Sequence, residues 1–109
     1  MMKMIYAIVR PEKAYEVNKA LADAGFVAST KWSVSGRGKQ HGIHVGDVIY
    51  DEMSKNILMI ACDEEDKNEI IDVIMDTAQT GEDGNSGDGR IFVVPIEESY
   101  TISTRCKDD

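Results

Sequence analysis

Hydrophobic and polar residues follow patterns along the chain that predict strands alternating with two helices. Apolar β-formers run together or alternate with polar residues in four stretches, which we expect to be strands: 3–9, 26–35, 57–62 and 90–94. Apolar residues recur every three or four positions in two further stretches, which we expect to be helices: 11–24 and 63–80. Alternation at Tyr100, Ile102 and Thr104 predicts a short final strand.

The order of these elements predicts an α+β domain of ferredoxin-like βαββαβ type with a short extra C-terminal strand. Two helices cover one face of such a sheet, and the other face would still carry apolar residues. We therefore expect the chain to associate with copies of itself. The domain is expected to span residues 1–105, and residues 106–109 are expected to form a flexible tail.

Local signals mark the ends of the helices. Pro11 suits the first turn of the first helix, and Gly25 suits the position just after its end. The acidic run 63–66 supplies a candidate N-cap and favourable charge at the start of the second helix, which should end at Thr80-Gly81. The predicted buried stripes consist of Ala14, Val17, Leu21 and Ala24 in the first helix and Ile70, Ile71, Ile74, Met75 and Ala78 in the second.

Length and composition limit the classes of function. The 109 residues suffice for one domain with a core of its own, and the formal charge is −8. Residues 1–42 carry seven Lys and Arg against three Asp and Glu, whereas residues 43–109 carry five against seventeen. An acidic chain without a basic stripe argues against nucleic acid and against anionic membranes. We expect a cytoplasmic protein with no targeting segment and no membrane insertion, and with Cys62 and Cys106 as reduced thiols.

The first candidate site is a glycine loop that leaves the predicted strand 26–35. It has the sequence Gly-Arg-Gly-Lys-Gln-His-Gly at positions 36–42. Glycine lets main-chain N–H groups approach a ligand closely, and Arg37 and Lys39 add positive charge, so the loop suits a small anion. A solvated turn without a ligand is the alternative, since loose glycine motifs occur often by chance.

Two further loops lie between the predicted elements. Residues 43–54 form a polar connector that is too long for a tight turn, and long loops of this kind are often functional. A second glycine loop at 81–89 follows the second helix, although Gly81 and 87–89 are also compatible with simple turns. His41 and His44 could begin a metal site, but no Cys or further His lies near them in the sequence.

Four of these stretches together resemble the nitrogen regulatory P-II family of signalling proteins. The stretches are Ile-Val-Arg-Pro at 8–11, the loop at 36–42, Thr-Ala-Gln-Thr-Gly at 77–81 and Gly-Asp-Gly-Arg-Ile-Phe-Val at 87–93. The short loop at 43–54 resembles the branch that acts with a sister protein on nitrogenase. The resemblance implies a homotrimer, possibly with a sister P-II subunit, that senses ATP or ADP and 2-oxoglutarate with Mg²⁺ and regulates a nitrogenase component through loop 43–54.

The resemblance also implies which residues hold the ligands. The residues implied in nucleotide binding are Thr30, Gly36, Arg37, Gly38, Lys39, Gln40, Thr80, Gly87, Asp88, Gly89 and Arg90. Those implied in 2-oxoglutarate binding are Gly38, Gln40, Gly42 and Lys55, with Gln40 also holding Mg²⁺. A magnesium ion held by phosphate oxygens and one side-chain oxygen would be an ordinary site for this hard cation.

The chain departs from the family pattern in two places. Two arginines that clamp the triphosphate in many relatives are replaced by Thr101 and Ser103, so part of the phosphate clamp is missing unless Arg90 or Arg105 takes over this role. The 81–89 loop is also about three residues longer than in the family pattern. These departures leave open a degenerate P-II-like trimer that acts as an interaction module with weak or no nucleotide binding.

An acylphosphatase-like hydrolase of the same topology is the rival from a different class. Such an enzyme needs an arginine and a group of N–H donors just after the first strand. Arg10 is present there, but Pro11 follows it and no serine or cysteine has an evident base as partner. We therefore expect a chain that is not an enzyme.

Overall fold

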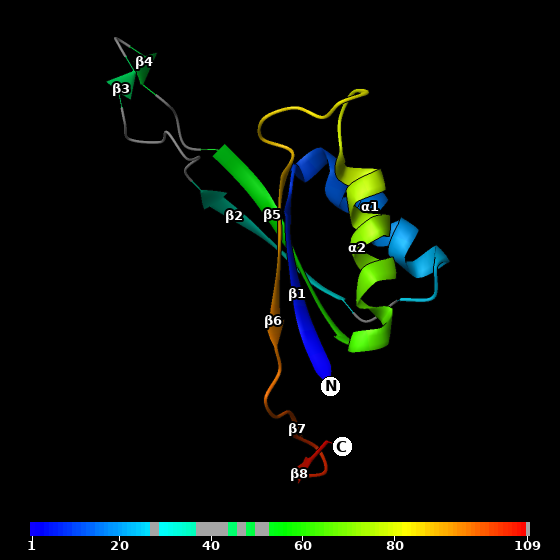
Figure 1. Cartoon of the computed structure of the whole chain (residues 1–109). Helices are drawn as coiled ribbons and strands as arrows, with labels where there is room; N and C mark the ends of the chain where they lie inside the picture. The colour runs from blue at the N-terminus through cyan, green and yellow to red at the C-terminus, as the bar shows by residue number, and fades with distance from the viewer. Residues whose placement is uncertain (27–28, 37–43, 46–47, 50–52, 109) are drawn as a thin grey trace.

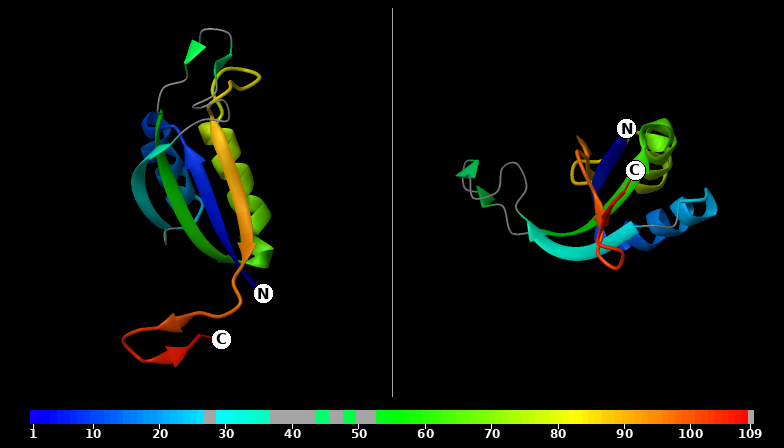
Figure 2. Two further views of the ribbon diagram at one scale, coloured as in Figure 1. Left: turned by 90° about the vertical axis from the view of Figure 1, so that its left-hand side faces the viewer. Right: turned by 90° about the horizontal axis from the view of Figure 1, so that it is seen from below.

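The computed structural model describes residues 1–26, 29–36, 44–45, 48–49 and 53–108. Its elements in chain order are β1 (Met2–Val9), α1 (Pro11–Asp23), β2 (Ser29–Gly36), β3 (His44–Val45), β4 (Val48–Ile49), β5 (Met53–Asp63), α2 (Glu64–Ala78), β6 (Gly89–Pro95), β7 (Tyr100–Thr101) and β8 (Cys106–Lys107). Both helices lie on the same side of the sheet (Figures 1 and 2). No helix among the described residues covers the other side, which we call the bare face.

The main sheet has four strands in the order β2-β5-β1-β6, and every neighbouring pair is antiparallel. This is the strand order of a ferredoxin-like fold, so the predicted fold class is confirmed. β1 lies in the interior, where Ile5 pairs with both Ile60 of β5 and Val93 of β6. β2 and β6 form the two edges.

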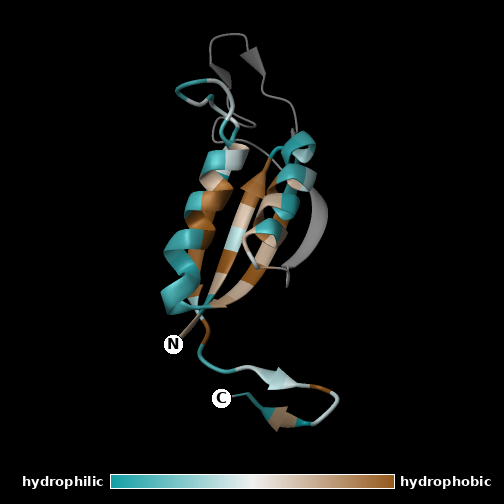
Figure 3. Ribbon diagram, turned by 90° about the vertical axis from the view of Figure 1, so that its right-hand side faces the viewer, coloured by the Kyte–Doolittle hydropathy of each residue, from teal (hydrophilic) through white to brown (hydrophobic). Residues whose placement is uncertain are grey.

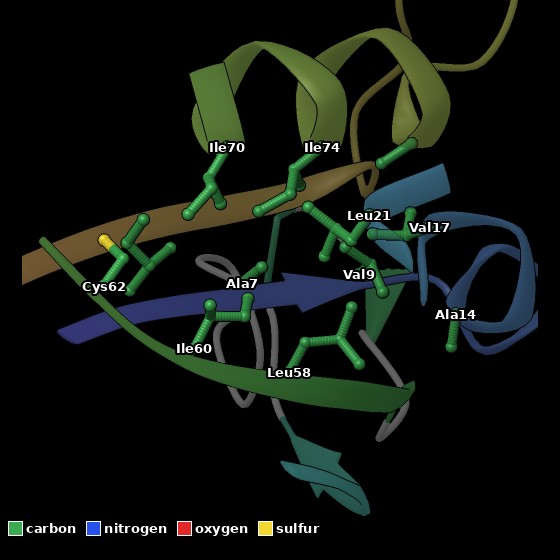
Figure 4. Packing of buried hydrophobic residues seen from close by; sticks show 12 residues of the cluster. Ala7, Val9, Ala14, Val17, Leu21, Leu58, Ile60, Cys62, Ile70 and Ile74 are labelled. Carbon is green, nitrogen blue, oxygen red and sulfur yellow. The ribbon is translucent and has the colours of Figure 1, made fainter. Parts of the chain in front are cut away.

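The core lies between the sheet and the helices (Figure 4). Ile5, Ala7 and Val9 alternate along β1 toward the helices and are at most 2% exposed. They pack with residues of the other elements, which are Ala14, Val17, Leu21, Leu58, Ile60, Cys62, Ile70, Ile74 and Ala78. The face of the sheet that the two helices cover is mostly hydrophobic, as seen between the helices in Figure 3.

The first helix ends as its sequence predicts. Gly25 has φ +97°, and its N–H donates to the carbonyl of Ala22 while the N–H of Phe26 donates to the carbonyl of Leu21. This pair of bonds is a Schellman motif, which needs a residue that tolerates positive φ. Ala24, which we expected in the buried stripe, is exposed because it lies at the C-cap.

The second helix differs slightly from expectation at both ends. Asp63 occupies the N-cap, but its side chain makes no capping hydrogen bond, and the N–H of Glu64 donates to the carbonyl of Met1 instead. The helix ends at Ala78 rather than Thr80. Met75, expected in the buried stripe, is 53% exposed because it lies at the margin of the face that contacts the sheet.

Two segments carry more regular structure than the sequence indicated. The connector 43–54 contains the antiparallel pair β3–β4, and β5 begins at Met53 rather than at Ile57. At the C-terminus, β7 and β8 pair as a hairpin, with Tyr100 opposite Lys107. Cys106 and Lys107, which the sequence analysis assigned to the tail, form β8 of this hairpin.

The two cysteines are free, Cys62 buried and Cys106 exposed. Burial raises the pKa of the Cys62 thiol, and the nearby charges of Asp66 and Asp63 raise it further. Among the described residues no helix is long and apolar enough to cross a membrane.

Leu58 tests the core because its side chain is completely buried in the middle of β5. We expect Leu58→Ala to lower the free energy of unfolding by about 2–5 kcal/mol, since it removes apolar contacts and leaves a cavity. Urea denaturation at fixed protein concentration measures this change. Tyr15→Ala, at a side chain that is mostly exposed on α1, serves as the control and should change stability by less than about 0.5 kcal/mol.

Candidate functional site

One end of the sheet collects the charged and glycine-rich segments of the chain. Val9, the last residue of β1, pairs with Asn56 of β5 on one side and with Gly89 of β6 on the other. Arg10, Lys55 and the second glycine loop (residues 81–89) therefore meet at this end. The final residue of β2, Gly36, lies there too, because it pairs with Met53.

The side chain of Asp88 accepts four of the hydrogen bonds that fix the second glycine loop. Its Oδ1 accepts hydrogen bonds from Thr80 Oγ1 at 2.6 Å and Arg10 Nε at 3.0 Å. Its Oδ2 accepts from the N–H of Asn85 at 2.9 Å and the N–H of Thr80 at 3.1 Å. These bonds, that from the Thr80 hydroxyl first, hold the pKa of Asp88 well below its usual range. The carboxylate thus fastens the end of α2, the loop and the end of β1 together.

Two basic side chains at this end of the sheet donate hydrogen bonds to main-chain carbonyl oxygens of the loop. Arg10 Nη2 donates to the carbonyl oxygen of Ser86 at 3.0 Å, and Lys55 Nζ donates to the carbonyl oxygen of Gly87. Partial burial lowers the pKa of Lys55, and the neighbouring charge of Arg10 lowers it further, while Glu12 and Asp88 act in the opposite direction. The site therefore concentrates positive charge where the loop meets the sheet.

Gly89 shows why the loop needs glycine where it joins β6. Its φ is +118°, and a Cβ atom built there would lie 1.7 Å from the carbonyl oxygen of Ile8. The main chain of Gly89 therefore lies against β1 at a distance that no side chain permits. Gly87, with φ +97°, is similarly close to the guanidinium of Arg10, whose Nη2 would lie 3.2 Å from an added Cβ.

Asn85 links the second glycine loop to Thr80 at its start and to Asp88 near its end. Its Nδ2 donates to Thr80 Oγ1 at 2.9 Å and to the carbonyl of Thr80 at 3.1 Å, and its own carbonyl accepts from the N–H of Asp88 at 3.1 Å. The added residues therefore form an ordered turn tied to the end of α2. The extra length does not separate Thr80 from Asp88.

A hollow of about 300 Å³ lies behind the loop, between α2 and β6. Apolar side chains such as Ile74, Ala78 and Ile91 line most of it, and Asp88 and Arg90 lie at its polar end. This volume is at the low end for small-molecule pockets. Within the described residues, no group of three His, Cys, Asp or Glu could hold a metal ion.

The structure brings together six of the residues that the sequence pointed to: Lys55, Thr80, Gly87, Asp88, Gly89 and Arg90. Thr30 and Gly36 lie on β2, where they pair with Met59 and Met53. The remaining predicted residues, Arg37, Gly38, Lys39, Gln40 and Gly42, lie outside the described part of the chain.

Sequence reasoning missed Arg10 and Asn85 as members of this site. Arg10 belongs to the stretch Ile-Val-Arg-Pro and directly follows a buried strand, but neither signal indicated its partner Asp88, which is far along the chain. Asn85 could have been found from the spacing Asn-x-x-Asp, because such short polar residues often cap a turn by bonding to nearby main chain.

Comparison with known proteins identifies the family. The model of the nitrogen regulatory protein P-II family matches residues 2–106. The chain belongs to the P-II family. Members are signal-transduction regulators rather than enzymes, which confirms the prediction that the chain is not an enzyme and removes the hydrolase alternative.

Several relatives are similar over nearly their whole length. The nitrogen fixation nifHD region GlnB-like protein 1 of Methanobacterium ivanovii is 51% identical over 97% of this chain and 98% of the relative. The protein of the same description from Methanococcus maripaludis is 50% identical over 95% and 96%. These names confirm the resemblance to the nitrogenase-associated branch and support a role in nitrogen regulation.

A solved structure of this family has the same fold. The crystal structure of Arabidopsis thaliana PII bound to citrate superimposes with a TM-score of 0.77 and 26% sequence identity. The match covers 99% of this P-II chain and 86% of the other.

Two glycine substitutions test how the loop is held. Gly25→Ala adds a side chain at positive φ in open space, so we expect a loss of about 1–2 kcal/mol from backbone strain. Gly89→Ala adds the same methyl group against the Ile8 carbonyl, and we expect at least about twice that loss because β6 must move away from β1. Urea denaturation of both variants measures the difference, and equal losses would contradict the close approach.

The ionisation of Asp88 gives a prediction for the effect of pH. Its pKa is lower in the folded than in the unfolded chain, so its contribution to stability is fully present above the ordinary aspartate range and is lost as the pH falls through the lowered value. We expect the amide signals of Thr80 and Asn85 in NMR spectra to stay unchanged from neutral pH to below the ordinary range. A transition of both signals at an ordinary aspartate pKa would show that Asp88 does not hold these amides.

Proposed function

We propose that this P-II protein is a trimeric sensor of ATP or ADP and 2-oxoglutarate that regulates nitrogen metabolism. Its target is a nitrogenase component, contacted through residues 43–54. The observation that carries the proposal is the meeting of Arg10, Lys55 and the second glycine loop at the end of the sheet where β2 also ends.

The chemistry of this end of the sheet suits a polyphosphate. Gly89 is exposed, so a ligand can reach the main chain there, and Lys55 and the exposed Arg90 supply positive charge. A magnesium ion would be held by the phosphates and by Gln40, and 2-oxoglutarate would complete its shell with Lys55 on the far carboxylate. A ligand that shares the metal with ATP would raise its own affinity when ATP is bound.

The bare face of the sheet supports assembly into a trimer. Strand residues alternate, so those between the helix-facing positions point to the bare face. The apolar residues on that face are Met4, Tyr6, Ile8, Ile57, Met59, Phe92 and Val94. Phe92 and Val94 are 49% and 39% exposed on the edge strand β6. An apolar surface of this kind is typical of an interface, and copies of the same chain, with or without a sister P-II subunit, would cover it.

The target is proposed from the relatives' names. Two of the most similar relatives are described as proteins of the nitrogen fixation nifHD region. Residues 43–54 follow β2 in the sequence, include the short pair β3–β4 and run into the start of β5, which lies at the same end of the sheet as Lys55. A ligand that changes this segment would shift its affinity for a protein partner in the cytoplasm.

A degenerate interaction module without nucleotide binding is the second candidate. In the C-terminal hairpin the Thr101 hydroxyl donates to Asp108 at 2.6 Å, and Ser103 lies in the turn. Neither residue supplies the positive charge of the arginines found there in many relatives. Loss of charged partners of a phosphate would weaken nucleotide binding.

Calorimetry separates these candidates. We expect heat on adding ATP or ADP to the wild type, and heat on adding 2-oxoglutarate when ATP and Mg²⁺ are present. Gln40→Ala should remove 2-oxoglutarate binding and change ADP affinity little, because the proposed role of Gln40 is at the metal and the oxo-acid.

Two results would contradict these roles. Absence of heat with every nucleotide at millimolar concentration would favour the interaction module. Equal losses of ADP and 2-oxoglutarate binding in Gln40→Ala would contradict the role given to Gln40. Lys19→Gln, at an exposed position on α1, is the control and should bind both ligands as the wild type does.

A further inference from the structure

Arg10 reaches from the end of β1 to the second glycine loop through two separate hydrogen bonds. Its Nε bonds to the Asp88 carboxylate and its Nη2 bonds to the Ser86 carbonyl, each at 3.0 Å. Both side chains of the ion pair are largely shielded, with exposed fractions of 27% for Arg10 and 19% for Asp88. Shielding of this order makes the pair less subject to screening by salt than an ion pair on an open surface.

The carboxylate of Asp88 is fully engaged inside the protein. Each of its oxygens accepts two hydrogen bonds, from Arg10 and Thr80 on Oδ1 and from the main chain of Thr80 and Asn85 on Oδ2. A carboxylate turned toward a phosphate would also repel it. Asp88 therefore has neither a free acceptor site nor a favourable charge with which to contact a nucleotide.

We propose that Arg10 and Asp88 are positioning residues, which hold the second glycine loop in its anion-binding conformation without contacting the anion themselves. This inference rests on the proposed binding of nucleotide at the loop. It reassigns Asp88, which the family resemblance places among the nucleotide contacts, and it adds Arg10. The ligand class is a polyphosphate anion such as ADP.

The physical basis of the proposal is that the ion pair orders the second glycine loop before a ligand binds. The second glycine loop contains glycines at 81, 84, 87 and 89, all with positive φ. Glycine-rich backbone loses much conformational entropy when it is fixed. If the ion pair fixes the loop before the ligand arrives, the ligand does not bear that cost and binds more tightly. The same pair sets the position of the Gly87 carbonyl, to which Lys55 donates.

A double-mutant cycle tests whether the two side chains act as one unit. The variants are Arg10→Gln, Asp88→Asn and the double variant, and the measured quantity is the dissociation constant of ADP by calorimetry. We expect each single change to weaken ADP binding by roughly tenfold, as for loss of a hydrogen bond to a charged group. The double variant should be about as weak as either single one, because the second change removes a partner that is already lost.

Hydrogen exchange of the free protein provides a second measurement that does not need the ligand. We expect faster exchange of the Thr80 and Asn85 amides in both single variants, since these N–H groups donate to Asp88. Arg10→Lys keeps the charge but not the forked geometry, so it should restore ADP binding and amide protection only in part.

A control on α1 and three contrary results make both measurements decisive. Lys19→Gln and Asp23→Asn remove an exposed ion pair on α1, 3.6 Å long, and should change neither measurement. Independent losses that add in the double variant would show that Arg10 and Asp88 do not act as one unit, which would overturn the proposal. Unchanged exchange at Thr80 and Asn85 would also overturn it. If the wild type binds no nucleotide, the proposed function fails, while the exchange measurement still decides whether the pair positions the loop.

Discussion

The structure depends on the central place of β1 in the sheet. Its helix-facing side chains, Ile5, Ala7 and Val9, are buried against both helices, and its main chain bonds to β5 on one side and β6 on the other. Arg10, Lys55 and the second glycine loop all lie at the same end of this strand. Arg10 continues it, Lys55 lies on β5 beside it, and Gly89 is pressed against its Ile8 carbonyl.

This arrangement explains how a long loop can be part of a well-defined site. A glycine-rich segment has little local preference for one conformation, so its order must come from tertiary contacts. Here the contacts converge on one carboxylate, that of Asp88, which accepts from the end of β1, the end of α2 and the loop itself. Because Arg10 directly follows β1 and Thr80 lies two residues beyond α2, the loop takes its position from these two elements.

Much of the fold could be predicted from the sequence because its signals are local. The run of apolar β-formers in β1, the apolar stripes of the helices and the glycine after α1 each act over a few residues. The contact of Arg10 with Asp88 could not be predicted in this way, since the two residues are 78 positions apart and meet only through strand pairing. Of the short final strand predicted at Tyr100, Ile102 and Thr104, the structure has only β7 at Tyr100–Thr101, and its partner β8 was missed because a two-residue strand leaves almost no periodicity to detect.

The C-terminal hairpin is attached to the sheet by very little. The N–H of Ile96 donates to the Met2 carbonyl, and among the described residues beyond it the hydrogen bonds of 98–108 join hairpin residues only to one another, for example Ser99 with Asp108. Swinging this unit about residues 96–98 would therefore break none of the sheet's bonds. Ile102 at the tip of the hairpin is 92% exposed. If the hairpin moves as one unit, this apolar side chain can contact another surface without loss of the β7–β8 pairing.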